Sequence, residues 1–165
     1  MADTAATADN VGADAPARGF VLADFLPYQL SLAANAVSRA VADGSGYAAR
    51  FGLSAAEWRV LAHVAAAGTP SQAEVAGLAA MDKMTISRAV TSLGSRRLVD
   101  RRRDPGDRRT LRLSLTEEGA RVHAHVAPRA LAVEARLLAA LSSEEAATLR
   151  RALATLAKES GPPAA

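Results

Sequence analysis

Residues 82–119 decide the fold, and they read DKMTISRAVTSLGSRRLVDRRRDPGDRRTLRLSLTEEG. In the first part, apolar residues recur every three or four positions, at Ile86, Val90 and Leu93, which is typical of an amphipathic helix. In the last part, leucines alternate with polar residues from Leu111 to Leu115, which is typical of a strand with one buried face. The stretch therefore predicts a helix followed by a strand.

A turn sequence separates this strand from a segment that can pair with it. Asp104-Pro105-Gly106-Asp107 contains a proline, which fixes φ, and a glycine, which accepts positive φ. We therefore expect residues 99–103 to pair with residues 111–115 in a β-hairpin. The hairpin is rich in arginine and would form a basic wing after the helix.

Capping signatures mark the starts of further helices. Three S-x-x-E motifs place a serine and a glutamate where their side chains bind amide groups at a helix start, and they are Ser54/Glu57, Ser71/Glu74 and Ser142/Glu145. The helix after Ser71 should bury Val75 and Leu78. An earlier helix should begin near Pro27 and weaken at residues 44–46, and Asp82 and Thr116 should cap the helices that follow them.

The helix after Thr116 needs a partner. About 24 residues at 1.5 Å each give roughly 36 Å, which is too long for a lone compact domain of this size. The expected fold class is mainly α with a small β-hairpin wing, a winged helix-turn-helix with terminal dimerisation helices. The expected divisions are a disordered tail over 1–19, an N-terminal dimerisation helix over 20–50, a winged helix-turn-helix region over 51–116, and C-terminal linker and dimerisation helices over 117–160.

Composition excludes several classes of protein. The 165 residues suit one domain with a dimerising extension. There is no cysteine, which excludes disulfides and thiolate zinc sites. No signal peptide and no uninterrupted apolar run of about 18 residues is visible, so we expect a soluble, cytoplasmic protein.

Positive charge is concentrated in one window. Residues 82–112 hold ten lysines and arginines against four aspartates, a net charge of +6, whereas the whole chain carries +3. Such a patch on an otherwise slightly acidic chain is typical of a protein that binds a polyanion, although a solvated arginine-rich face is the alternative.

The predicted order of short helix, turn, polar-faced helix and basic hairpin is that of a winged helix-turn-helix, whose second helix enters the major groove of DNA. Helix 82–97 turns small polar and basic side chains outward, and Arg88 can donate two hydrogen bonds to guanine. An arginine at the hairpin tip can enter a narrow minor groove, although Asp104 or Asp107 could instead pair with Arg109 to brace the loop. The candidate DNA-binding residues are Lys83, Thr85, Ser87, Arg88, Thr91, Arg101, Arg103, Arg108 and Arg109.

From about Leu22 to Lys158 the chain resembles the MarR family of multiple-antibiotic-resistance-type regulators. The resemblance is most specific from residue 82 to residue 88, at Leu98-Val99, over residues 104–109, and over residues 115–119. It implies that Arg88 reads the major groove and Arg108 the minor groove. It also implies a dimer formed by the terminal helices, a palindromic operator in double-stranded DNA, and release by small aromatic or anionic ligands. The chain departs from the family pattern at Arg97, where the family usually has a glycine.

Candidate ligand-binding residues lie on the first two long helices. Tyr28, Trp58, Arg59 and His63 could hold an aromatic acid, although aromatic residues at helical spacing are more often part of a core. His123 and His125 form an H-x-H motif, but residues two apart point about 200° apart on a helix, so we expect no zinc site and exposed side chains. No cofactor is expected beyond such an effector.

Three other classes of function stay open as alternatives. An RNA-binding winged-helix protein would normally place aromatic residues among its basic ones, and the basic window has none. No nucleophile elbow, P-loop or zinc-protease motif indicates an enzyme. A dimeric helical adaptor is compatible with the long helices, but it does not require the basic hairpin.

Overall fold

The computed structural model describes residues 19–79 and 81–160. The chain divides into two compact units between Asn35 and Ala36. The mainly helical architecture with one two-stranded hairpin confirms the predicted fold class. Within residues 19–79 and 81–160, no helix is long and apolar enough to cross a membrane.

The first unit contains little beyond the start of a helix. A short 3-10 helix, η1 (Leu22–Asp24), precedes α1 (Leu26–Ser45), and α1 continues past Asn35 into the second unit. Phe20 and Phe25 pack edge to face with their ring centroids 5.3 Å apart. The predicted disordered tail lies outside the described residues, apart from Gly19.

A one-turn helix that the sequence analysis missed precedes the central helices. Helix α2 (Tyr47–Phe51) lies between Gly46 (φ 73°) and Gly52 (φ 59°), whose left-handed backbone reverses the chain on both sides. Tyr47 is buried in the core of the second unit. Helix α2 therefore packs in the same core as the helices that follow it.

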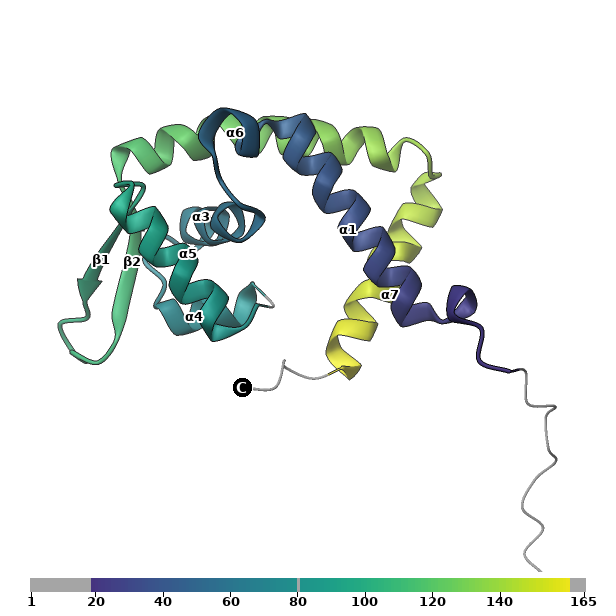
Figure 1. The fold of residues 1–165 in the computed structure, drawn as a ribbon, viewed down its shortest axis with the longest axis horizontal. Coiled ribbons are helices and arrows are strands. Elements are labelled where there is room, and N and C mark those ends of the chain that lie inside the picture. The colour runs from purple at the N-terminus through teal and green to yellow at the C-terminus, as the bar shows by residue number, and fades with distance from the viewer. Residues whose placement is uncertain (1–18, 80, 161–165) are drawn as a thin grey trace, which may run out of the picture. The chain divides into compact units, whose positions relative to one another are not determined.

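The core of the second unit forms where three helices pack against the hairpin (Figure 1). These helices are α3 (Ala55–Ala67), α4 (Gln72–Leu78) and α5 (Lys83–Ser95). Ser54 and Ser71 make the predicted capping boxes, and Asp82 caps α5. The fully buried side chains include Val60, Leu61, Val64, Val75, Ile86, Val90 and Leu93.

The prediction that Leu78 is buried is wrong, since this side chain is 63% exposed. Helix α4 has only seven residues, and Leu78 is the last of them. Ala79 follows Val75 by four residues and lies on the same side, so it takes the inward position instead.

The hairpin has the predicted pairing. Strands β1 (Val99–Arg103) and β2 (Leu111–Leu115) are antiparallel, with Arg101 opposite Leu113. The backbone N–H of Leu113 also donates to the carbonyl of Pro70 over 2.8 Å, which joins the hairpin to the start of α4. The wing is therefore fixed to the helix-turn-helix by backbone as well as by its own turn.

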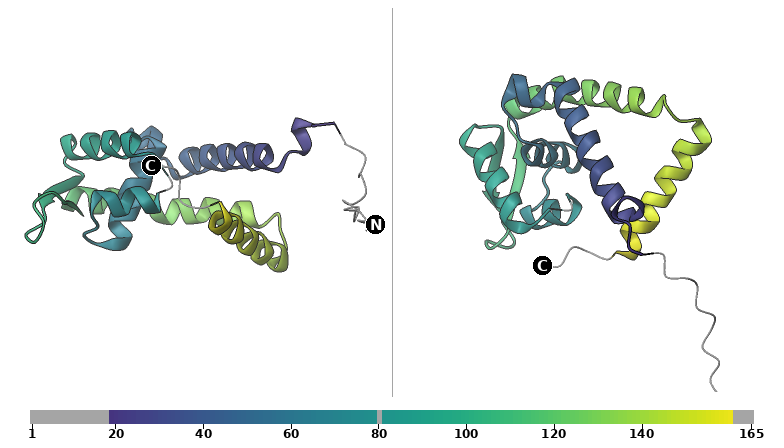
Figure 2. Two further views of the ribbon diagram at one scale, coloured as in Figure 1. Left: turned by 90° about the horizontal axis from the view of Figure 1, so that it is seen from below. Right: turned by 45° about the vertical axis from the view of Figure 1, so that its right-hand side comes forward.

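Two long helices complete the second unit. Helix α6 (Glu117–Leu138) is capped by Thr116 as predicted and remains one helix with Pro128 inside it (Figure 2). Helix α7 (Ser143–Glu159) begins at the third predicted capping box, Ser142 with Glu145. Each presents leucines that remain partly exposed, namely Leu131 and Leu137 on α6 and Leu149, Leu153 and Leu156 on α7.

Candidate nucleic-acid interface

The outward face of α5 carries the predicted DNA-contacting side chains. Lys83, Ser87, Arg88 and Thr91 are exposed, and Thr85 is half-buried. Thr85 donates both its backbone N–H (2.8 Å) and its hydroxyl (2.7 Å) to the Asp82 carboxylate, so part of its bonding capacity is used in capping the helix. The same hydrogen bonds, from the hydroxyl first, lower the pKa of Asp82. The four exposed residues form the free polar surface of the helix.

A buried carboxylate fixes α5 against α3. Glu57 accepts hydrogen bonds from the Ser92 hydroxyl (2.6 Å) and from the backbone N–H of Ser54 (2.7 Å). Burial alone would raise the pKa of Glu57, but these hydrogen bonds and the charge of Arg96 outweigh it, so the pKa is lowered. The capping glutamate that the sequence predicts therefore also positions the outward-facing helix.

Arg96 and Arg97 end α5 in different ways. The Arg96 guanidinium lies 3.7 Å from Glu57 and donates to the carbonyls of Phe51 and, over 3.2 Å, Gly52. Arg97 has φ 56°, the left-handed conformation that favours glycine. A residue with a Cβ therefore follows the helix in a conformation suited to glycine, the residue that the resemblance leads us to expect here.

An open pocket of about 350 Å³ adjoins Arg88 between the start of α3 and the face of α5. Trp58, Arg59 and His63 do not line it. The pocket is open to solvent, so Arg88 is not packed on this side and its guanidinium has room to turn outward. The lining residues are Ser54, Ala56, Glu57, Thr85, Arg88, Ala89 and Ser92.

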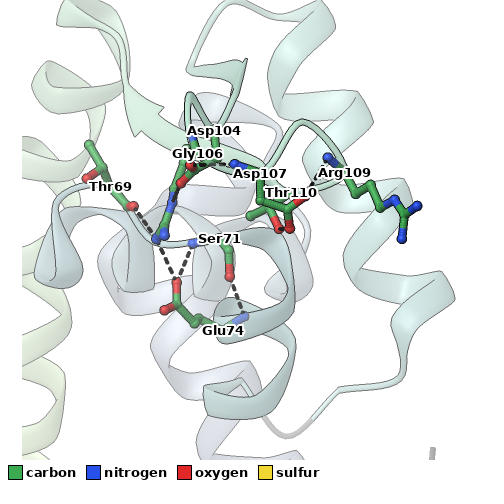
Figure 3. A network of polar contacts seen from close by, with 9 residues as sticks. Thr69, Ser71, Glu74, Asp104, Gly106, Asp107, Arg109 and Thr110 are labelled. Carbon is green, nitrogen blue, oxygen red and sulfur yellow. Dashed lines mark hydrogen bonds and ion pairs between the residues drawn. The ribbon is translucent and has the colours of Figure 1, made fainter.

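The turn of the wing is held by two aspartates (Figure 3). The Asp104 carboxylate accepts the backbone N–H groups of Gly106 (2.8 Å) and Asp107 (3.2 Å). Asp107 accepts the Arg109 backbone N–H (3.0 Å) and the Thr110 hydroxyl (2.8 Å). The alternative in which an aspartate pairs with the Arg109 guanidinium is not what the structure shows, because this side chain points away from the network in Figure 3.

Arg112, which the sequence analysis did not select, braces the wing instead. Its Nε donates to Asp104 (2.7 Å), and its Nη1 lies 3.2 Å from Glu74 and 3.4 Å from the Thr69 carbonyl. The hydrogen bond from Arg112 is the main cause of the lowered pKa of Asp104. A usable sequence signal is that Arg112 pairs with Arg102 across the hairpin, which is unfavourable unless one of them has an acidic partner.

The other predicted wing arginines are exposed but differ in what they contact. Arg103 donates to the Arg108 carbonyl over 2.5 Å, so its guanidinium supports the loop as well as carrying charge. Arg101 extends over α5. Among residues 19–79 and 81–160, no ion pair engages Arg88, Arg108 or Arg109. These three cations are available to an anionic partner.

The candidate ligand-binding residues are divided between the two units. Tyr28 belongs to the first unit and is exposed. Trp58 is half-buried and stacks between the rings of Tyr47 (5.9 Å) and His123 (5.7 Å). Arg59 is exposed and donates to the Ser38 hydroxyl over 3.5 Å. Arg59 and His63 lie one turn apart on α3, so they are the pair that shares a face.

The prediction of exposed histidines is wrong. His123 packs on Trp58, and His125 packs edge to face on Phe51 with ring centroids 5.2 Å apart. Burial, followed by the charges of Arg129 and Arg50, lowers the pKa of His125. In the part of the chain that the structure describes, no group of three potential metal ligands comes together.

Known proteins share this arrangement. A model of the MarR family matches residues 51–110. A probable transcriptional regulator from Pseudomonas aeruginosa is 33% identical, with a TM-score of 0.72 over 83% of this chain and 100% of that one. PcaV from Streptomyces coelicolor, solved with its natural ligand, is 26% identical, with a TM-score of 0.77 over 87% and 99% of the two chains.

CouR from Rhodococcus jostii, solved with p-coumaroyl-CoA, is 27% identical, with a TM-score of 0.71 over 84% of this chain and 95% of that one. Comparison with curated proteins finds no match. The family match covers α3 to α5, β1 and the turn of the hairpin but ends before β2, and the structural matches extend over the terminal helices. The chain therefore belongs to the MarR family of winged-helix transcriptional regulators, which bind DNA and are not enzymes.

Proposed function

We propose that this protein is a ligand-responsive repressor that binds a palindromic operator as a homodimer. The observation that carries the proposal is the exposed face of α5, where Arg88 has no carboxylate partner among the described residues and lies in the same unit as the free wing arginines. Helix 82–97 enters the major groove and wing 99–115 the minor groove.

The contacts divide by groove. In the major groove, Lys83, Ser87 and Thr91 approach the DNA while Arg88 donates two hydrogen bonds to guanine. In the minor groove, Arg108 or Arg109 inserts where the groove is narrow and its negative potential is strong. The aspartates that hold the turn support this role, because they fix the loop backbone without neutralising either guanidinium.

The terminal helices supply the dimer interface. Leucines 131, 137, 149, 153 and 156 are between 37% and 63% exposed, and exposed leucines along two helices are compatible with a protein interface. A second copy of the chain covers them. The two recognition helices then meet half-sites whose centres lie about 10 base pairs apart, one helical turn of DNA.

The effector is a small aromatic acid that binds beside α3. Arg59 and His63 share a face of this helix and can balance a carboxylate, and Trp58 is the neighbouring aromatic residue. CouR, solved with p-coumaroyl-CoA, is a related protein whose ligand contains an aromatic acyl group, which supports the aromatic part of this proposal. A 100-fold loss of operator affinity requires about 2.7 kcal/mol of differential binding, which two ligands can provide at roughly 1.4 kcal/mol each.

Fluorescence anisotropy with the DNA upstream of the protein's own gene tests the proposal. Arg88→Ala should weaken operator binding by about 1 to 3 kcal/mol and relax the preference at one base pair per half-site. Arg151→Ala removes an equal charge from α7 and should leave binding unchanged. Equal losses on operator and random DNA would remove base readout from Arg88, and tighter binding to RNA than to duplex DNA would replace the proposal with an RNA-binding function.

Salicylate-like and nicotinate-like acids, titrated against anisotropy and Trp58 fluorescence, test the effector. Arg59→Ala and His63→Ala should raise the acid concentration needed for release. Release at unchanged concentration in both variants would move the ligand site away from this face of α3.

A further inference from the structure

Gly94 is the second-to-last residue of α5. Its φ is not positive, so the backbone does not require glycine at this position. Glycine still favours helix less than alanine or glutamine does. What packs on Gly94 supplies a reason for a residue without a side chain.

The side chain that packs on Gly94 is that of Arg101. A Cβ atom at Gly94 would lie 3.3 Å from Arg101 Nε, 3.6 Å from Cζ and 3.7 Å from Nη2. Three guanidinium atoms at nearly equal distances mean that the group lies against the helix surface. Arg101 stands opposite the fully buried Leu113 in the hairpin, so its side chain leaves β1 on the face that covers α5.

This position extends the outward stripe of the helix. Gly94 follows Ser87 by seven residues and Lys83 by eleven, spacings that return to the same face within about 20°. The guanidinium therefore lies about 10 Å along the axis from Ser87. The major groove is about 12 Å wide, so a cation at this distance from base-contacting residues reaches the groove edge, where the phosphates are.

We propose that Gly94 is a positioning residue that seats Arg101 on the recognition helix, and that Arg101 contacts a backbone phosphate at the edge of the major groove. Among residues 19–79 and 81–160, no ion pair engages Arg101, so its charge is not used within the protein. The inference rests on the proposed DNA-binding function and specifies one of its contacts.

Gly94→Ala and Gly94→Gln test whether Gly94 positions Arg101. A side chain at position 94 should displace the Arg101 guanidinium from the surface of α5, and glutamine should displace it further than alanine. Operator affinity should fall by a few-fold for alanine and by roughly ten-fold per half-site for glutamine, the effect of one lost charge-assisted hydrogen bond. The thermal midpoint should hold or rise, because both residues favour helix. A loss of DNA binding without a loss of stability is a signature that a merely structural glycine does not give.

Arg101→Ala and the double variants close the cycle. Arg101→Ala should weaken operator and random DNA alike and reduce the salt dependence by about 0.9 per half-site. In the Arg101→Ala background, adding Gly94→Gln should not lower the affinity for DNA further. The inference would be overturned if either Gly94→Gln or Arg101→Ala left operator affinity unchanged. It would also be overturned if the losses of affinity from the two substitutions were additive in the double variant. Arg88→Ala serves as the reference: if it still loses operator binding, the DNA-binding proposal survives, and if the wild-type protein binds no duplex, both proposals fail.

Discussion

Replacing Arg97 by glycine should stabilise the protein. Arg97 is the one non-glycine residue with positive φ (56°) among the described residues. Its backbone cannot relax easily, because its carbonyl accepts the Thr116 hydroxyl at 2.6 Å and its N–H donates to the Gly94 carbonyl at 3.0 Å. The helix end and the start of α6 thus hold a side chain-bearing residue in a conformation suited to glycine.

The magnitude follows from two opposing effects. The left-handed conformation costs a residue with a Cβ roughly 1 to 2 kcal/mol, which glycine does not lose. Glycine in turn makes the unfolded chain more flexible, which costs about 0.4 to 1 kcal/mol. The net gain is roughly 0.5 to 1 kcal/mol, and for a chain of this size it raises the thermal midpoint by about 1 to 4 °C.

Thermal unfolding of Arg97→Gly and Arg97→Ala measures the effect. Both variants lose the guanidinium, but only the alanine keeps a Cβ, so their difference isolates the backbone. We expect the glycine variant to melt above both the alanine variant and the wild type. Equal midpoints for glycine and alanine would show that the positive φ costs nothing, and the reasoning would be refuted.

Three further substitutions probe the wing, the histidines and the helix packing. Arg112→Gln should lower operator affinity in anisotropy, especially with A·T-rich flanks, because it frees Asp104 and loosens the wing. Its effect on the thermal midpoint in melting should be small by comparison. His125→Gln should flatten the pH dependence of unfolding: the lowered pKa means that stability is complete above about pH 6.5 and falls as the pH drops below it. Gly119→Ala should destabilise the fold by roughly 2 to 3 kcal/mol in urea unfolding despite its better helix propensity, since its Cβ would lie 1.9 Å from a backbone oxygen.

Local signals predicted most of the secondary structure. Ser54, Ser71 and Ser142 cap the helices that follow them, and the alternation from Leu111 to Leu115 forms the predicted strand. A capping box involves residues only three apart, and a hairpin pairs neighbouring segments across its turn. Patterns of this range are visible in one sequence because the interacting residues are neighbours in it.

Contacts between distant residues could not be predicted in this way. Arg96 binds the carbonyls of Phe51 and Gly52, more than forty positions away, and Arg112 reaches Glu74 over a similar separation. The rings that pack on His123 and His125 come from other helices. In each case the partner is set by the tertiary arrangement, which the periodicity of a single segment does not contain.

The basic window therefore contains two kinds of arginine that the sequence does not distinguish. Arg96 and Arg112 are paired with carboxylates and join α5 and the wing to α3 and α4. Arg88 and Arg108 have no such partner in the described part of the chain. An arginine already paired with a carboxylate gains little from a phosphate, because the new contact must replace an existing one. On the proposed DNA-binding surface, the paired arginines therefore set the geometry, and the unpaired ones would provide the charge that meets the DNA.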